Sequence, residues 1–139
     1  MGLLPDPGAP HLLAGEYLVR DIVAADPDTG VLAIADAVEE GQHLVFAHRE
    51  PEAARGDLAR MLERVSPPST GMDYRFGLYF NCLARGRSLY RRESVDSGLL
   101  SRALPEVPLL GFFCNAEIGP IQGKNRLFTY TGILLLVGE

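Results

Sequence analysis

Polar and hydrophobic residues alternate along the first third of the chain, with turn residues between the alternating stretches. Apolar and β-branched positions over residues 17–23, 31–35 and 43–48 predict three strands. Asp26-Pro-Asp-Thr-Gly30 and Glu39-Glu-Gly41 lie between them and supply turn geometry. Connections this short favour an antiparallel meander.

The spacing of apolar residues then changes to that of a helix. Leu58, Leu62 and Val65 recur on one face of the segment 51–65, whose opposite face is largely charged. Pro51 suits the first turn of a helix because its missing N–H is not needed there. We therefore expect a helix over residues 51–65.

The second half of the chain predicts a strand, a helix and two further strands. These elements span residues 74–84, 94–104, 109–116 and 128–137, with Ser94 as a helix N-cap and a loop from Gly119 to Asn125. The fold class is α+β, with the order β-β-β-α-β-α-β-β. It is a single domain with a mostly antiparallel β-sheet, one β-α-β unit and two helices.

The amino-terminal segment reads differently from the rest. Residues 1–13 contain three prolines and are expected to form an extended lead-in or linker before a domain that covers residues 14–139.

The predicted β-α-β segment indicates where a ligand would bind. If strands 74–84 and 109–116 lie parallel in one sheet, their carboxyl ends meet at one edge, where open α/β sheets tend to bind ligands. We expect helix 94–104 to pack on the sheet face that carries Phe80, Cys82, Phe112 and Cys114.

Alternation places a polar group on the other face, at those carboxyl ends. Its members are Arg85, Glu117, Asn81 and Asn115, with Tyr79 and Phe113 beside them. Such a group would hold a small zwitterion, with the guanidinium on its carboxylate and the glutamate on its ammonium. The alternative is a structural Arg85–Glu117 ion pair, with the asparagines closing turns and no ligand.

Other chemistry finds less support in the sequence. Cys82 and Cys114 are predicted to be buried, reduced thiols; a nucleophilic Cys114 lacks a nearby histidine in the sequence. The three histidines and two cysteines show no metal-ligand spacing, so no metal is predicted. The basic run from Arg85 to Arg92, followed by Glu93 and Asp96, is interpreted as a solvated loop.

Composition narrows the function classes further. The formal net charge of −5 argues against a nucleic-acid partner or an anionic membrane surface. With two cysteines and no disulfide framework, a reducing cytoplasm is the expected location.

The chain resembles the carboxy-terminal domain of the FIST sensory family. The resemblance begins with the opening from Glu16 to Ala35 and continues through Glu40-Gly-Gln42 and Phe46-Ala-His-Arg-Glu50. It is densest at Asn81-Cys-Leu-Ala-Arg-Gly-Arg87 and at Val107-Pro-Leu-Leu-Gly-Phe-Phe-Cys-Asn-Ala-Glu-Ile-Gly-Pro120. It covers about residues 14–139. Ala116 departs from the family pattern, in which a glycine commonly stands at this position.

This resemblance implies a non-enzymatic, intracellular sensory input module that binds small ligands such as amino acids. It implies as partners a FIST N-like domain or a signalling output domain, and a homodimer is possible. The family also includes haem-binding sensors; no cofactor is predicted here, because no histidine can be assigned as a haem ligand. The rival hypothesis is a protein-interaction or scaffold domain that pairs with an amino-terminal sensory domain or with itself. An enzyme that uses Cys114 is the third hypothesis.

Overall fold

The computed structural model describes residues 2–3 and 17–139. The fold is α+β, as predicted, and the chain divides into two compact units. One unit runs to His48 and includes Ile118–Thr129; the other comprises Arg49–Glu117 and Tyr130–Glu139.

The first unit is built from short antiparallel strands. They are β1 (Gly2–Leu3), β2 (Leu18–Val19), β3 (Ile22–Ala25), β4 (Leu32–Ile34) and β5 (Leu44–Val45). β3 and β4 form the predicted hairpin, but the meander does not continue, because β5 pairs with β1 rather than with β4. Apart from β1, the predicted lead-in of residues 1–13 lies outside the described residues.

A hairpin of β8 (Glu117–Ile121) and β9 (Lys124–Phe128) replaces the predicted loop from Gly119 to Asn125. Gln122 and Gly123 form its turn, both with positive φ, at 50° and 74°. Pro120 lies within β8, and a proline in a short segment weakens the sequence signal for a strand.

The second unit contains a mixed three-stranded sheet. β6 (Tyr74–Cys82) is central; β10 (Gly132–Gly138) pairs with it antiparallel and β7 (Leu109–Cys114) pairs with it parallel. The parallel β6–β7 pair confirms the predicted β-α-β unit.

Four helices accompany this sheet. They are α1 (Pro51–Val65), α2 (Pro67–Thr70), α3 (Arg87–Tyr90) and α4 (Val95–Ala103). α1 has the predicted bounds and α4 lies within the predicted helix. The single turns α2 and α3 were not predicted.

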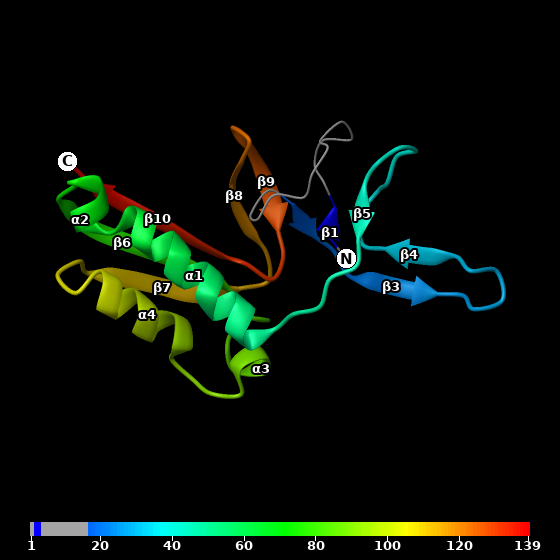
Figure 1. The fold of residues 1–139 in the computed structure, drawn as a ribbon, viewed down its shortest axis with the longest axis horizontal. Coiled ribbons are helices and arrows are strands. Elements are labelled where there is room, and N and C mark those ends of the chain that lie inside the picture. Colours follow the sequence, from blue (N-terminus) through cyan, green and yellow to red (C-terminus); the bar gives the residue numbers. More distant parts are fainter. Residues whose placement is uncertain (1, 4–16) are drawn as a thin grey trace. The chain divides into compact units, whose positions relative to one another are not determined.

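α1 and α4 lie against one face of the sheet (Figure 1). The core between them is formed by Leu58, Leu62, Tyr79, Leu100, Leu104 and Val107. Leu62 and Leu104 expose only 2% and 1% of their surface, and burying a leucine side chain is worth about 1.5–3 kcal/mol. The prediction that the second helix covers the face of Phe80 and Phe112 is therefore wrong.

That opposite face, which we call the apolar face, is lined by hydrophobic side chains from all three strands. Its members are Phe76, Leu78, Phe80, Leu110, Phe112, Ile133, Leu135 and Val137. Leu110 and Phe112 are 72% and 62% exposed. Alternation separates the two faces correctly but does not say which one a helix covers. Here the helices cover the face whose polar groups need partners.

Candidate ligand-binding groove

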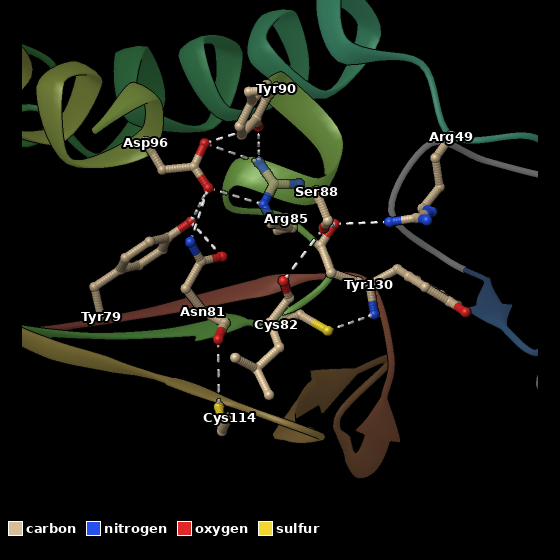
Figure 2. Close-up of polar contacts among 12 residues, drawn as sticks. Arg49, Tyr79, Asn81, Cys82, Arg85, Ser88, Tyr90, Asp96, Cys114 and Tyr130 are labelled. Carbon is tan, nitrogen blue, oxygen red and sulfur yellow. Dashed lines mark hydrogen bonds and ion pairs between the residues drawn. The ribbon is translucent and has the colours of Figure 1, made fainter. Parts of the chain in front are cut away.

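A buried carboxylate organises the carboxyl end of β6. Asp96, in the first turn of α4, accepts two hydrogen bonds from the Arg85 guanidinium, at 3.0 and 3.3 Å. It also accepts from the hydroxyls of Tyr90 and Tyr79 at 2.8 and 3.2 Å, and from the Asn81 amide at 3.0 Å. Figure 2 shows these five residues converging, and we call them the Asp96 cluster.

The electrostatics of the cluster follow from its burial. The side chains of Arg85 and Asp96 are only 11% and 5% exposed. Burial raises the pKa of Tyr79 and of Tyr90, and the Asp96 carboxylate raises both further. Burial by itself would lower the pKa of Arg85, but hydrogen bonding to Asp96 outweighs it and raises that pKa. The Arg85 guanidinium therefore stays charged and the two phenols stay neutral at physiological pH.

Two glycines leave room for Tyr79, one for its ring and one for its backbone. A Cβ at Gly132 would overlap the Tyr79 hydroxyl oxygen, and a Cβ at Gly111 would overlap the Tyr79 carbonyl oxygen. Gly132, on β10, therefore lets the Tyr79 side chain reach Asp96, whereas Gly111, on β7, lets the backbones of β6 and β7 approach closely.

Beside this cluster lies a cavity of about 630 Å³, which we call the β7–α4 groove. Its walls come from β6, from the loop that precedes α4, from α4 itself and from β7. Tyr79, Asn81 and Asp96 form its inner end, and the hydrophobic residues Leu100, Leu109 and Phe113 contribute apolar lining. The groove thus has the size and the mixed lining of a small-molecule site.

The groove also carries polar groups with no assigned role in the fold. Arg92 lines it and has no hydrogen-bond or ion-pair partner among the described residues. Ser97 and Ser101 line it from the exposed side of α4. Ser94 is the N-cap residue, as predicted, but its side chain makes no capping hydrogen bond. These groups suit an anionic or hydroxyl-bearing ligand better than Asp96 does, because five hydrogen bonds already occupy that carboxylate.

The structure brings together some of the predicted site residues. Tyr79, Asn81 and Phe113 line the groove, and Arg85 belongs to the Asp96 cluster that forms its inner end. Asn115 is exposed and is not among the residues that line the groove.

Glu117 is not the partner of Arg85, so the expected Arg85–Glu117 pair is wrong. Glu117 is 2% exposed and accepts a hydrogen bond from the Cys114 thiol at 3.3 Å. β7 ends at Cys114 and a separate strand, β8, begins at Glu117. This interruption breaks the alternation that predicted Glu117 beside Arg85. Burial raises the pKa of the Glu117 carboxyl.

Of the two thiols, Cys82 is buried, as predicted, whereas Cys114 is only half-buried. Both are free thiols. Burial raises the pKa of Cys114, and a higher pKa reduces the thiolate fraction at neutral pH.

Sequence reasoning missed Asp96, Tyr90 and Arg92. The basic run was interpreted as a solvated loop, but Arg85 is largely buried at its start and Asp96 is buried just beyond it. A usable signal was present: Asp96 precedes Leu100 by four residues, so both lie on the helix face that packs inward.

Within residues 2–3 and 17–139, no group of three or more histidine, cysteine, aspartate or glutamate side chains is placed to hold a metal ion. In that same part of the chain, no helix has both the length and the apolar character needed to cross a membrane.

The fold is that of an α+β domain with a mixed β-sheet covered by helices on one face. Residues 3–120 match the model of the FIST C domain, and the chain belongs to this family of sensory signal-transduction domains.

Relatives of the chain are known from mycobacteria. An uncharacterised protein of Mycobacterium tuberculosis is 36% identical over 122 residues, which cover 88% of this chain and 32% of the relative. An uncharacterised protein of Mycobacterium bovis is 34% identical over 129 residues, which cover 91% of this chain and 33% of the relative. The chain therefore spans about a third of the length of these curated relatives.

Proposed function

We propose that this domain senses a small molecule, an amino acid or a similar compound, that binds in the β7–α4 groove. The observation that carries the proposal is the 630 Å³ groove, which runs along β7 from Leu109 to Phe113 and includes Tyr79 and Asn81 of the parallel strand β6. Small-molecule sites in proteins have volumes of about 300–1,000 Å³ and a mostly apolar lining with a few polar groups.

The groove offers a cationic side chain for the carboxylate of an amino acid and an anionic side chain for its ammonium group. Arg92 lies at the groove with its charge unpaired among the described residues, so it would receive a carboxylate. Glu93 also lines the groove, at an exposed position opposite the Arg87 guanidinium at 3.6 Å, and would receive an ammonium. Arg85 would act indirectly, by holding the Asp96 cluster that forms the wall.

A thermal-shift series over the common amino acids and small carboxylates tests this proposal. A ligand at a hundredfold excess over its Kd stabilises the folded state by about 2.7 kcal/mol, which is easily measured. Ser97→Trp, which fills the groove from the exposed side of α4, should abolish the shift. Arg102→Trp is the matched control, because Arg102 is exposed on the same helix and does not line the groove.

The results separate cleanly. A shift that Ser97→Trp removes and Arg102→Trp retains supports the groove as the sensing site. A ligand that shifts the wild type and Ser97→Trp equally would place the binding elsewhere. The absence of a shift throughout the series would contradict the proposal.

The setting of the domain is part of the same proposal. We expect it to work in the cytoplasm, without catalysis, and to pass its signal to a FIST N-like domain or an output domain. The acidic balance of the chain, net −5, argues against nucleic acid or an anionic membrane as partner.

The apolar face favours a second candidate function, that of a protein-interaction domain. Exposed apolar patches larger than a few hundred Å² commonly mark protein contacts. Pairing with itself would appear as a dimer in sedimentation velocity, and Phe112→Glu should dissociate it. Phe46→Glu is a control on another exposed phenylalanine, 75% exposed and outside the apolar face. A monomer at all concentrations would exclude self-pairing through this face.

A further inference from the structure

β7 is an edge strand whose backbone is paired on one side only. Among the described strands, β6 is its single neighbour. The carbonyls of Pro108 and Cys114 point towards β6, since they accept hydrogen bonds from Gly77 and Leu83, each at 2.9 Å. In a strand, the N–H and C=O of one residue point to the same side, and those of the next residue point to the opposite side. The backbone groups of the odd-numbered residues 109, 111 and 113 therefore point to the unpaired side.

This edge lacks the features that usually protect an exposed strand. Natural edge strands carry lysines, prolines or bulges that discourage pairing with another chain. β7 reads Leu-Leu-Gly-Phe-Phe-Cys, without charge or proline, and its register with β6 runs without interruption. In the described part of the chain, three outward N–H groups and three outward carbonyls thus face no neighbouring strand and are available to one extended backbone.

The β7–α4 groove adds a place for side chains beside this edge. All six residues of β7 except Cys114 line the groove, and α4 borders it with Leu100, Ser97 and Ser101. An edge strand next to a helix-bordered groove is the arrangement in which domains bind extended peptides by strand addition.

We propose that β7 binds an extended peptide segment of another protein as an added strand. Main-chain hydrogen bonds to the outward groups of Leu109, Gly111 and Phe113 would supply affinity. Alternate side chains of the peptide would enter the groove and should be apolar, to match Leu100 and the Tyr79 ring. An acidic residue of the peptide would pair with Arg92.

Charge decides between such a peptide and a second copy of this chain. Two copies could pair through their β7 strands, but β7 contains no acidic residue to meet Arg92. A peptide segment of another protein that carries an acidic residue would pair both with the outward backbone groups of β7 and with the Arg92 guanidinium. This inference goes beyond the small-molecule proposal and does not depend on it.

The test uses fluorescein-labelled octapeptides in which valine alternates with threonine. One set carries aspartate at either end, and a matched set carries arginine there. We expect fluorescence anisotropy to rise with the aspartate peptides and much less with the arginine peptides. Arg92→Ala should remove this difference, because Arg92 provides the charge discrimination.

Proline at position 113 isolates the main-chain contribution. Phe113→Pro removes an outward N–H, which an edge strand tolerates, whereas Phe113→Ala keeps that N–H and removes only the ring. We expect the proline variant to bind about tenfold more weakly than the alanine variant, as for the loss of a backbone hydrogen bond. Equal affinities of the two variants would overturn the proposal.

Hydrogen exchange provides a measurement that needs no variant. Saturating aspartate peptide should slow exchange of the amides of Leu109, Gly111 and Phe113, and leave those of Leu110 and Phe112 nearly unchanged. Absence of peptide binding, or binding without this alternating protection, would overturn strand addition. Protection of the same amides by dimerisation without any peptide would assign the edge to a second copy instead.

Discussion

Arg85 and Asp96 form a buried ion pair in which the Arg85 Nε lies 3.0 Å from Oδ2 of Asp96. Arg85 follows the end of β6 and Asp96 lies in the first turn of α4, so the pair joins the two elements across the inner end of the groove. Tyr90 and Tyr79 extend the same contact from α3 and from the middle of β6.

Asp96→Asn should therefore destabilise the fold strongly. The substitution leaves the Arg85 charge buried without a counter-charge, and breaking a buried pair in this way costs about 3–5 kcal/mol. Urea unfolding measures the loss. Glu93→Gln is the control, because the Arg87–Glu93 pair is solvated at both ends, 79% and 78% exposed. A loss in Asp96→Asn as small as in Glu93→Gln would mean that the cluster contributes little to stability.

The sequence predicts the elements of the second unit better than their contacts. Helical spacing places α1 correctly, and the β-α-β rule predicts the parallel β6–β7 pair, since both depend on local periodicity. Which face of the sheet the helices cover depends on where the polar side chains of that face find hydrogen-bond partners. Predicting the covered face from the sequence therefore requires Asp96 to be recognised as an inward-facing residue of α4.

The incorrect part of the candidate site has a local cause. Counting by twos from Phe113 predicts that Glu117 lies on the groove face, but the chain leaves the strand after Cys114. Tyr79, Asn81 and Phe113 precede that break and do line the groove. The first unit is harder to predict because β5 pairs with β1, far away in sequence.

The two buried phenols predict a loss of stability at alkaline pH. The folded-state pKa values of Tyr79 and Tyr90 lie above the ordinary value of 10.0, so folding favours their protonated forms. Their contribution is complete below about pH 10 and is lost as the pH rises further towards the folded-state values. The urea-unfolding free energy should fall more steeply above about pH 10 in the wild type than in Tyr79→Phe. Identical slopes would contradict this assignment.

Glu117 predicts a pH dependence at the acid end. Its folded-state pKa is raised above the ordinary value of 4.5, chiefly by burial, so the folded state favours the protonated carboxyl. That contribution is present below about pH 4.5 and is lost as the pH rises through the folded-state pKa. Glu117→Gln should therefore gain stability relative to the wild type between acid and neutral pH. Glu106→Gln, at an exposed position, should show no such trend; a relative loss in Glu117→Gln would reverse the assignment.

Gly132→Ala tests whether the Tyr79 side chain packs against Gly132 as closely as the structure indicates. The new Cβ would overlap the Tyr79 hydroxyl and lie 2.7 Å from the ring carbon that bears it, so we expect a loss of about 1–3 kcal/mol. Gly98→Ala in α4 is the matched control: its Cβ would meet only Arg102, at 3.5 Å, and should stabilise the helix by up to about 1 kcal/mol. In a Tyr79→Phe background, the overlap with the hydroxyl disappears and the cost of Gly132→Ala should shrink. Urea unfolding of the four variants measures this coupling, and strictly additive costs would show that Gly132 and Tyr79 do not constrain one another.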